Sequence, residues 1–124
     1  MALSGAVCER RKFVRMYSDF PVQLKYMKPN TPIQIHNSLS QDLSEGGLQI
    51  SSYYFYPVNS QMIVELQLNA DTVPIKTVGK VVWVEQLPYQ DVFKLGIEFS
   101  ELSVFNQKAL RQLIADKFDL NQIN

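Results

Sequence analysis

Hydrophobic and polar residues alternate along most of this chain, the pattern of β-strands that bury one face. The clearest alternations begin at Phe20, Met62 and Phe93, and weaker ones begin near Ile33 and Leu48. Segments rich in proline, asparagine, serine and aspartate separate these runs and predict turns. They are residues 29–32, 57–60 and 69–71. The chain is therefore predicted to be rich in short antiparallel strands.

Two segments depart from this simple alternation. The run from Val73 to Trp83 contains Gly79, which predicts one long strand, or a strand pair, bent near the glycine. From Ser103 to Phe118 the apolar residues are spaced by three and four, as in a one-sided helix, and Ser103 is suited to cap its start. We predict a mainly β fold, a small antiparallel barrel of about six strands with a C-terminal α-helix.

Composition sets the size and the general class of the fold. The 124 residues are enough for one hydrophobic core, and the 46% hydrophobic and 19% charged fractions are ordinary for a globular domain. Twelve basic and twelve acidic side chains cancel. The net charge therefore gives no overall attraction to nucleic acid or to an anionic membrane, and an anion site has to be built locally.

Cysteine and histidine are nearly absent. Cys8 and His36 are the single residues of their types, so the sequence predicts no internal disulfide, no Cys/His metal site and little equipment for acid–base or nucleophilic catalysis. We interpret Cys8 as an ordinary thiol and expect a reducing, cytoplasmic location. No run approaches the roughly 20 apolar residues of a spanning helix, so no membrane insertion is expected.

Two short segments carry the candidate chemistry. Arg10, Arg11, Lys12 and Arg15 lie within a short basic arm near the N-terminus. Alone, such a run is usually a solvated surface. Residues 42–47 read Asp-Leu-Ser-Glu-Gly-Gly between two predicted strands. Alone, this hexapeptide is typical of a turn, because Asp and Ser bond locally and glycine accepts unusual backbone angles.

Together the two segments resemble the signature of the PilZ domain family. That signature is Arg-x-x-x-Arg near the N-terminus, here Arg11 and Arg15, followed by Asp/Asn-x-Ser-x-x-Gly, here residues 42–47. Residues 79–83 and 96–99 are also similar to later strands of the family. The resemblance spans about residues 10–118 and implies a PilZ-like β-barrel with a trailing helix.

The resemblance also implies a division of the chain. We expect a flexible tail over residues 1–9, a PilZ domain over 10–119 and a second tail over 120–124. Within the domain we expect a flexible basic ligand-binding arm over 10–19, a barrel over 20–99 and a helix over 103–118.

The ligand implied by the resemblance is cyclic di-GMP. Arginine can fork onto a guanine edge, pair with a phosphate or stack on a base, and Asp42 and Ser44 offer acceptors to guanine N–H groups. Gly47 would let backbone approach the purine. The expected ligand-binding residues are Arg10, Arg11, Arg15, Asp42, Ser44, Gly46 and Gly47. No metal and no cofactor are expected.

In the family, an arginine directly before the first motif arginine is associated with two stacked ligand copies, and Arg10 has that position. Trp83 is interpreted as a core residue, with the edge of the site as the alternative. Glu45 is interpreted as solvated.

The resemblance implies a receptor without chemistry of its own, which signals to an unidentified effector protein as its arm becomes ordered. Control of motility or biofilm formation is typical of the family. One alternative is a ligand-independent adaptor in motility or pilus machinery, although both motifs are intact. Direct binding of a nucleic acid polymer is disfavoured by the neutral net charge. The aromatic run 53–56 is left open between a partner surface and the core.

Overall fold

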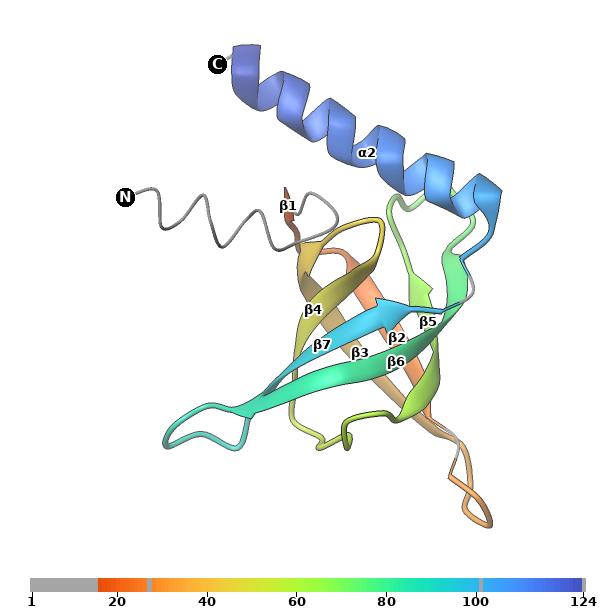
Figure 1. The fold of residues 1–124 in the computed structure, drawn as a ribbon, viewed down its shortest axis with the longest axis vertical. Coiled ribbons are helices and arrows are strands. Elements are labelled where there is room, and N and C mark those ends of the chain that lie inside the picture. The colour runs from red at the N-terminus through yellow and green to blue at the C-terminus, as the bar shows by residue number, and fades with distance from the viewer. Residues whose placement is uncertain (1–15, 27, 101, 124) are drawn as a thin grey trace.

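The computed structural model describes residues 16–26, 28–100 and 102–123, with side chains described as far as Asp116. Within these residues, seven strands precede one long helix (Figure 1). The strands are β1 (Met16–Tyr17), β2 (Pro21–Tyr26), β3 (Gln34–Leu43), β4 (Gly47–Ser52), β5 (Gln61–Leu66), β6 (Ile75–Gln86) and β7 (Phe93–Phe99). The helix is α2 (Val104–Ile123).

The sheet closes on itself as a barrel. Its strand order is β1-β3-β2-β5-β6-β7-β4, and a further pairing of β3 with β4 joins the two sides. Every pairing is antiparallel. Strands β2 to β7 therefore form a six-stranded barrel, and β1 lies as a short extra strand against β3. The predicted mainly β fold with a C-terminal helix is confirmed.

The barrel core comes from the inward positions of each strand. On β2, β4 and β5 the buried and less buried residues alternate, because successive side chains point to opposite faces. The fully buried residues are large aliphatic side chains for the most part. They include Leu24, Leu43, Ile50, Val64, Leu66, Val81 and Leu95.

Two segments close the ends of the barrel. Helix α2 crosses one end, next to the β3–β4 turn (Figure 1), and contributes Leu110 and Ile114 to the core. The residues between β4 and β5 cross the other end, where Tyr56 is only 1% exposed. Tyr56 packs edge-on against Tyr26 and is hydrogen bonded to His36.

The helix prediction is confirmed in type and start, with two differences. Ser103 caps the helix, since its Oγ accepts a hydrogen bond from the N–H of Asn106 at 3.1 Å. The helix continues to Ile123, beyond the predicted end at 118. Phe105, whose spacing in the predicted helix matches the buried face, is 80% exposed. Within the described residues, no helix combines the length and the apolar character needed to cross a membrane.

The start of the barrel also differs from the prediction. Residues 16–19 were assigned to the arm, but Met16 is buried in the core and β1 pairs with β3. Ser18 adds a hydrogen bond from its N–H to the carbonyl of Gln41 at 3.1 Å. The sheet therefore begins at Met16, ahead of the first barrel strand β2, and residues 1–15 lie outside the described part of the chain.

Candidate functional site

The motif Asp42–Gly47 forms the turn between β3 and β4. Asp42 is the penultimate residue of β3 and is half-buried, while Ser44 is only 6% exposed. The N–H of Ser44 donates to the carbonyl of Gly47 at 2.9 Å, and the Ser44 hydroxyl accepts from the N–H of Gly46 at 3.2 Å. That hydroxyl also donates to the carbonyl of Gly47 at 3.4 Å. Ser44 therefore holds the shape of the turn from within it.

The two glycines of the motif lie against β7. The carbonyl of Gly46 accepts a hydrogen bond from the N–H of Phe99 at 2.9 Å. A Cβ atom at Gly47 would collide with the carbonyl oxygen of Ile97. Neither glycine has a positive φ, so unusual backbone angles are not the reason for glycine here. Gly47 instead permits the close approach of β4 to β7.

Asp42 belongs to a row of residues on the outer face of the barrel. The strand register pairs Tyr17 with Asp42, Asp42 with Gln49, Gln49 with Gly96, and Gly96 with Trp83. Directly paired residues of antiparallel strands present their side chains on the same face. The row crosses β1, β3, β4, β7 and β6, four strand spacings or about 19 Å along the surface.

A bulge in β3 places Asp42 in this row. The register of β3 against β4 shifts between Ser40 and Asp42, so Gln41 is the extra residue. The amide of Gln41 donates to Ser51 Oγ at 2.7 Å, and its side-chain oxygen accepts from Gln49 Nε2 at 3.3 Å. The bulge is therefore fixed by polar contacts to β4.

Trp83 lies at the far end of the row and not in the core, which differs from the core position predicted from the sequence. A register shift between Val81 and Trp83 makes Val82 a bulge in β6. Val81 and Val84 pack in or against the core, whereas the half-buried indole of Trp83 covers the backbone of Gly96. Any side chain at Gly96 would occupy the space of that ring. The site-edge alternative for Trp83 stays a prediction.

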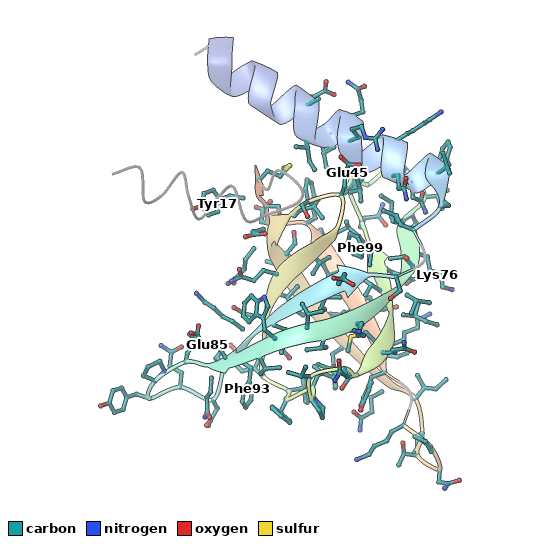
Figure 2. The ribbon with its side chains drawn as sticks, viewed as in Figure 1. Tyr17, Glu45, Lys76, Glu85, Phe93 and Phe99 are labelled. Atoms are coloured by element: carbon teal, nitrogen blue, oxygen red, sulfur yellow. The ribbon has the colours of Figure 1, made fainter. Side chains whose placement is uncertain are left out.

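Glu45 connects the motif turn to helix α2. Its Oε1 accepts hydrogen bonds from Nε and Nη2 of Arg111 at 3.0 and 2.9 Å. The Glu45 side chain is 20% exposed and lies between the barrel and the helix (Figure 2). The hydrogen bond to Glu45 raises the pKa of Arg111 above its usual value. The interpretation of Glu45 as a solvated side chain was therefore wrong.

The predicted arginines Arg10, Arg11 and Arg15 lie outside the described residues, as does Cys8. The described residues show the course of the chain directly after Arg15. Arg15 directly precedes Met16 in the sequence, and Met16 pairs with Leu43, the neighbour of Asp42. The segment that follows Arg-x-x-x-Arg therefore runs alongside the strand that ends in Asp-x-Ser-x-x-Gly.

The row was not found from the sequence, although some signals were present. A glycine inside a strand pattern, as at Gly96, marks a close approach by another group. The two bulges carry no comparable signal, and without them the register that joins Asp42 to Trp83 cannot be derived.

Comparison with known proteins agrees with the fold. The sequence matches the PilZ domain family over residues 9–116. No match was found among curated proteins. Among solved structures, the barrel resembles the Bacillus subtilis inhibitor of motility MotI/DgrA, with a TM-score of 0.73, 23% identity, and coverage of 89% of this chain and 52% of that one.

Two structures with a bound ligand are also similar. The PilZ domain of YcgR from Escherichia coli, with c-di-GMP, has a TM-score of 0.65 at 14% identity, with coverage of 86% of this chain and 90% of that chain. The MrkH–c-di-GMP complex of K. pneumonia has a TM-score of 0.70 at 15% identity, with coverage of 91% and 54%. This chain therefore spans about half the length of MotI/DgrA and MrkH.

Proposed function

This chain belongs to the PilZ domain family, and from that premise we propose that it binds cyclic di-GMP and signals the bound state to a protein partner. The family commonly binds c-di-GMP, and its members are generally non-enzymatic receptors. The similar structures of YcgR and MrkH were solved with c-di-GMP. We therefore propose a receptor that is not an enzyme and works in the bacterial cytoplasm.

One observation carries this proposal. The pairing of β1 with β3 brings the segment directly after Arg15 beside Asp42, although 26 positions separate Met16 from Asp42 in the sequence. The residues that directly follow one half of the signature thereby lie beside Asp42, the first residue of the other half. A site built from both halves can address a guanine and a phosphate together, which neither motif does alone.

The proposed contacts follow from the chemistry of the ligand. Arg11 and Arg15 bind the guanine O6/N7 edges and the phosphates, because the planar guanidinium offers paired donors. Asp42 accepts from guanine N–H groups on the outer face. Ser44, with its hydroxyl engaged in the turn, contributes chiefly by holding Gly46 and Gly47 in place. Trp83 borders the site at the other end of the row.

Arg10 bears on the stoichiometry of binding. Its position directly before Arg11 supports two stacked copies of the ligand in place of one, as the family pattern implies. A stacked pair presents more anionic and aromatic surface than a single copy, and the outer-face row offers room across several strands.

For signalling, we propose that ligand binding orders the basic arm against the barrel and that an effector protein recognises the result. The contact between Glu45 and Arg111 gives a second route, because it joins the motif turn to α2. Control of motility or biofilm formation is the proposed setting, in line with the family.

Calorimetric titration of cyclic di-GMP into the purified protein tests the receptor function. We expect saturable binding, with a ratio near two ligands per chain. Substitution of both Arg11 and Arg15 by Ala should weaken binding about thirtyfold or more, since each bidentate contact contributes about 1–3 kcal/mol. Both proteins should be titrated at one salt concentration.

The matched control replaces two exposed lysines, Lys28 and Lys108, by Ala. It removes the same charge and should bind like the wild type. Equal weakening of binding in both double variants would show that the effect comes from the lost positive charge and not from Arg11 and Arg15 in particular. No binding by a folded wild type would refute the receptor function and favour the ligand-independent adaptor, for which pull-down of protein partners is the next measurement.

A further inference from the structure

Tyr17 is an aromatic side chain held in the open by an ordered backbone. Its side chain is 92% exposed and projects outward from β1 (Figure 2). Burial of an aromatic ring is favourable, so such exposure in a paired strand leaves a large apolar face without a partner in the described residues. The feature calls for a reason other than packing.

The backbone around Tyr17 is anchored on both sides. Met16 is buried in the core and pairs with Leu43. Ser18 follows, with its N–H bonded to the carbonyl of Gln41 at 3.1 Å and its Oγ bonded to Ser40 Oγ at 2.7 Å. With both neighbours fixed, the alternation of the strand directs Tyr17 away from the core.

Tyr17 also begins the outer-face row. It pairs directly with Asp42, so the two side chains share one face of the sheet. In sequence it comes two residues after Arg15. The ring is therefore next to the carboxylate that we assign to guanine and close in sequence to an arginine that we assign to the same ligand.

We infer that Tyr17 is a stacking platform for one base of the bound dinucleotide. This role rests on the proposed function and adds a residue that belongs to neither signature motif. An aromatic ring binds a purine face without regard to its hydrogen-bonding edge, so Tyr17 supplies affinity while Asp42 and the arginines select guanine. Because the backbone of Tyr17 is already held in β1, contact with the base restricts only the side-chain torsions.

Calorimetric titration of cyclic di-GMP into four proteins tests this role: the wild type, Tyr17→Ala, Tyr17→Phe and Tyr89→Ala. Loss of the ring in Tyr17→Ala should raise Kd about tenfold or more. Tyr17→Phe keeps the ring face and should bind within about twofold of the wild type. Tyr89, 106% exposed in the β6–β7 turn, is the matched control, and its loss should leave Kd unchanged.

The outcomes separate the two proposals. If the wild type binds and Tyr17→Ala binds equally well, the stacking role is refuted while the receptor function stands. Equal weakening of Tyr17→Ala and Tyr17→Phe would assign the effect to the hydroxyl and also refute stacking. A wild type that does not bind overturns both proposals. Melting of each variant without ligand should match the wild type, because Tyr17 contributes little to the core.

Discussion

Substitution of Gly47 by Ala tests whether the motif glycine serves the barrel itself. The added Cβ would occupy the position of the Ile97 carbonyl oxygen, so β4 and β7 must separate locally. Two backbone hydrogen bonds of the turn are then strained, from Phe99 N–H to Gly46 and from Ser44 N–H to Gly47, both 2.9 Å long. Each contributes about 1 kcal/mol.

Forcing a group into filled space costs a further 1–3 kcal/mol or so. The expected loss in the free energy of unfolding is about 3–5 kcal/mol, a large part of the 5–15 kcal/mol typical of domains. The obstacle is backbone, so no neighbouring side chain can relieve it by changing rotamer.

Urea denaturation followed by far-ultraviolet circular dichroism measures this loss. Gln49→Ala is the matched control, because Gln49 lies on the same face of β4 and its truncation adds no atom and removes only the exposed 3.3 Å contact to Gln41. The control should stay within about 0.5 kcal/mol of the wild type. If Gly47→Ala is less than about 1 kcal/mol below the wild type, the close approach of β4 to β7 does not explain the glycine.

Three other predictions concern the titration of Tyr56, the titration of His36 and the contact between Glu45 and α2. Burial, followed by the charges of Tyr54 and Tyr26, raises the pKa of Tyr56 to about 12. The folded protein therefore favours the neutral phenol, and this contribution to stability is complete below pH 10. As the pH rises from 10 to 12, the free energy of unfolding should fall by up to about 2–3 kcal/mol. Burial lowers the pKa of His36, so its contribution is full above pH 6.5 and falls as the pH drops below that value. Urea midpoints over pH 5–12, compared with Tyr56→Phe, check the alkaline part, which the variant should lack. Arg111→Ala should lower the urea midpoint only slightly, and by less in 1 M salt, because the Arg111 side chain is 62% exposed at its contact with Glu45; a salt-independent decrease would contradict this.

The fold could be predicted where the apolar residues of an alternating strand are also the residues that are buried in the core. The runs beginning near Phe20, Met62 and Phe93 correspond to β2, β5 and β7, whose inward positions are mainly apolar. The helix was found because Ser103 caps it and Leu110 and Ile114 follow the helical spacing.

Strand β3 shows why the rest could not be predicted. Its Ile35 is 52% exposed, while His36, Ser38 and Ser40 occupy the inward side opposite β2. Hydrogen bonds satisfy these polar groups, such as Ser38 Oγ to the carbonyl of Ser51 at 2.6 Å. Hydrophobicity therefore points to the wrong face of β3.

The candidate site, like the fold, could be predicted from the sequence only in part. The residue types and spacing of the motifs identified the turn at Asp42 and its relation to the family. The partners that surround it depend on the strand register, which the bulges at Gln41 and Val82 shift. A one-residue shift moves every later side chain to the opposite face, so the core interpretation of Trp83 failed for a reason that lies at Val82.

The position of Trp83 has a consequence for spectroscopy. It is the single tryptophan of the chain, and its indole lies over Gly96 on the outer face instead of in the core. Its fluorescence emission therefore originates on the same strip of surface as Asp42. The native protein carries its own optical probe there, and changes in the colour and intensity of that emission report on what occupies the outer face, with no label attached.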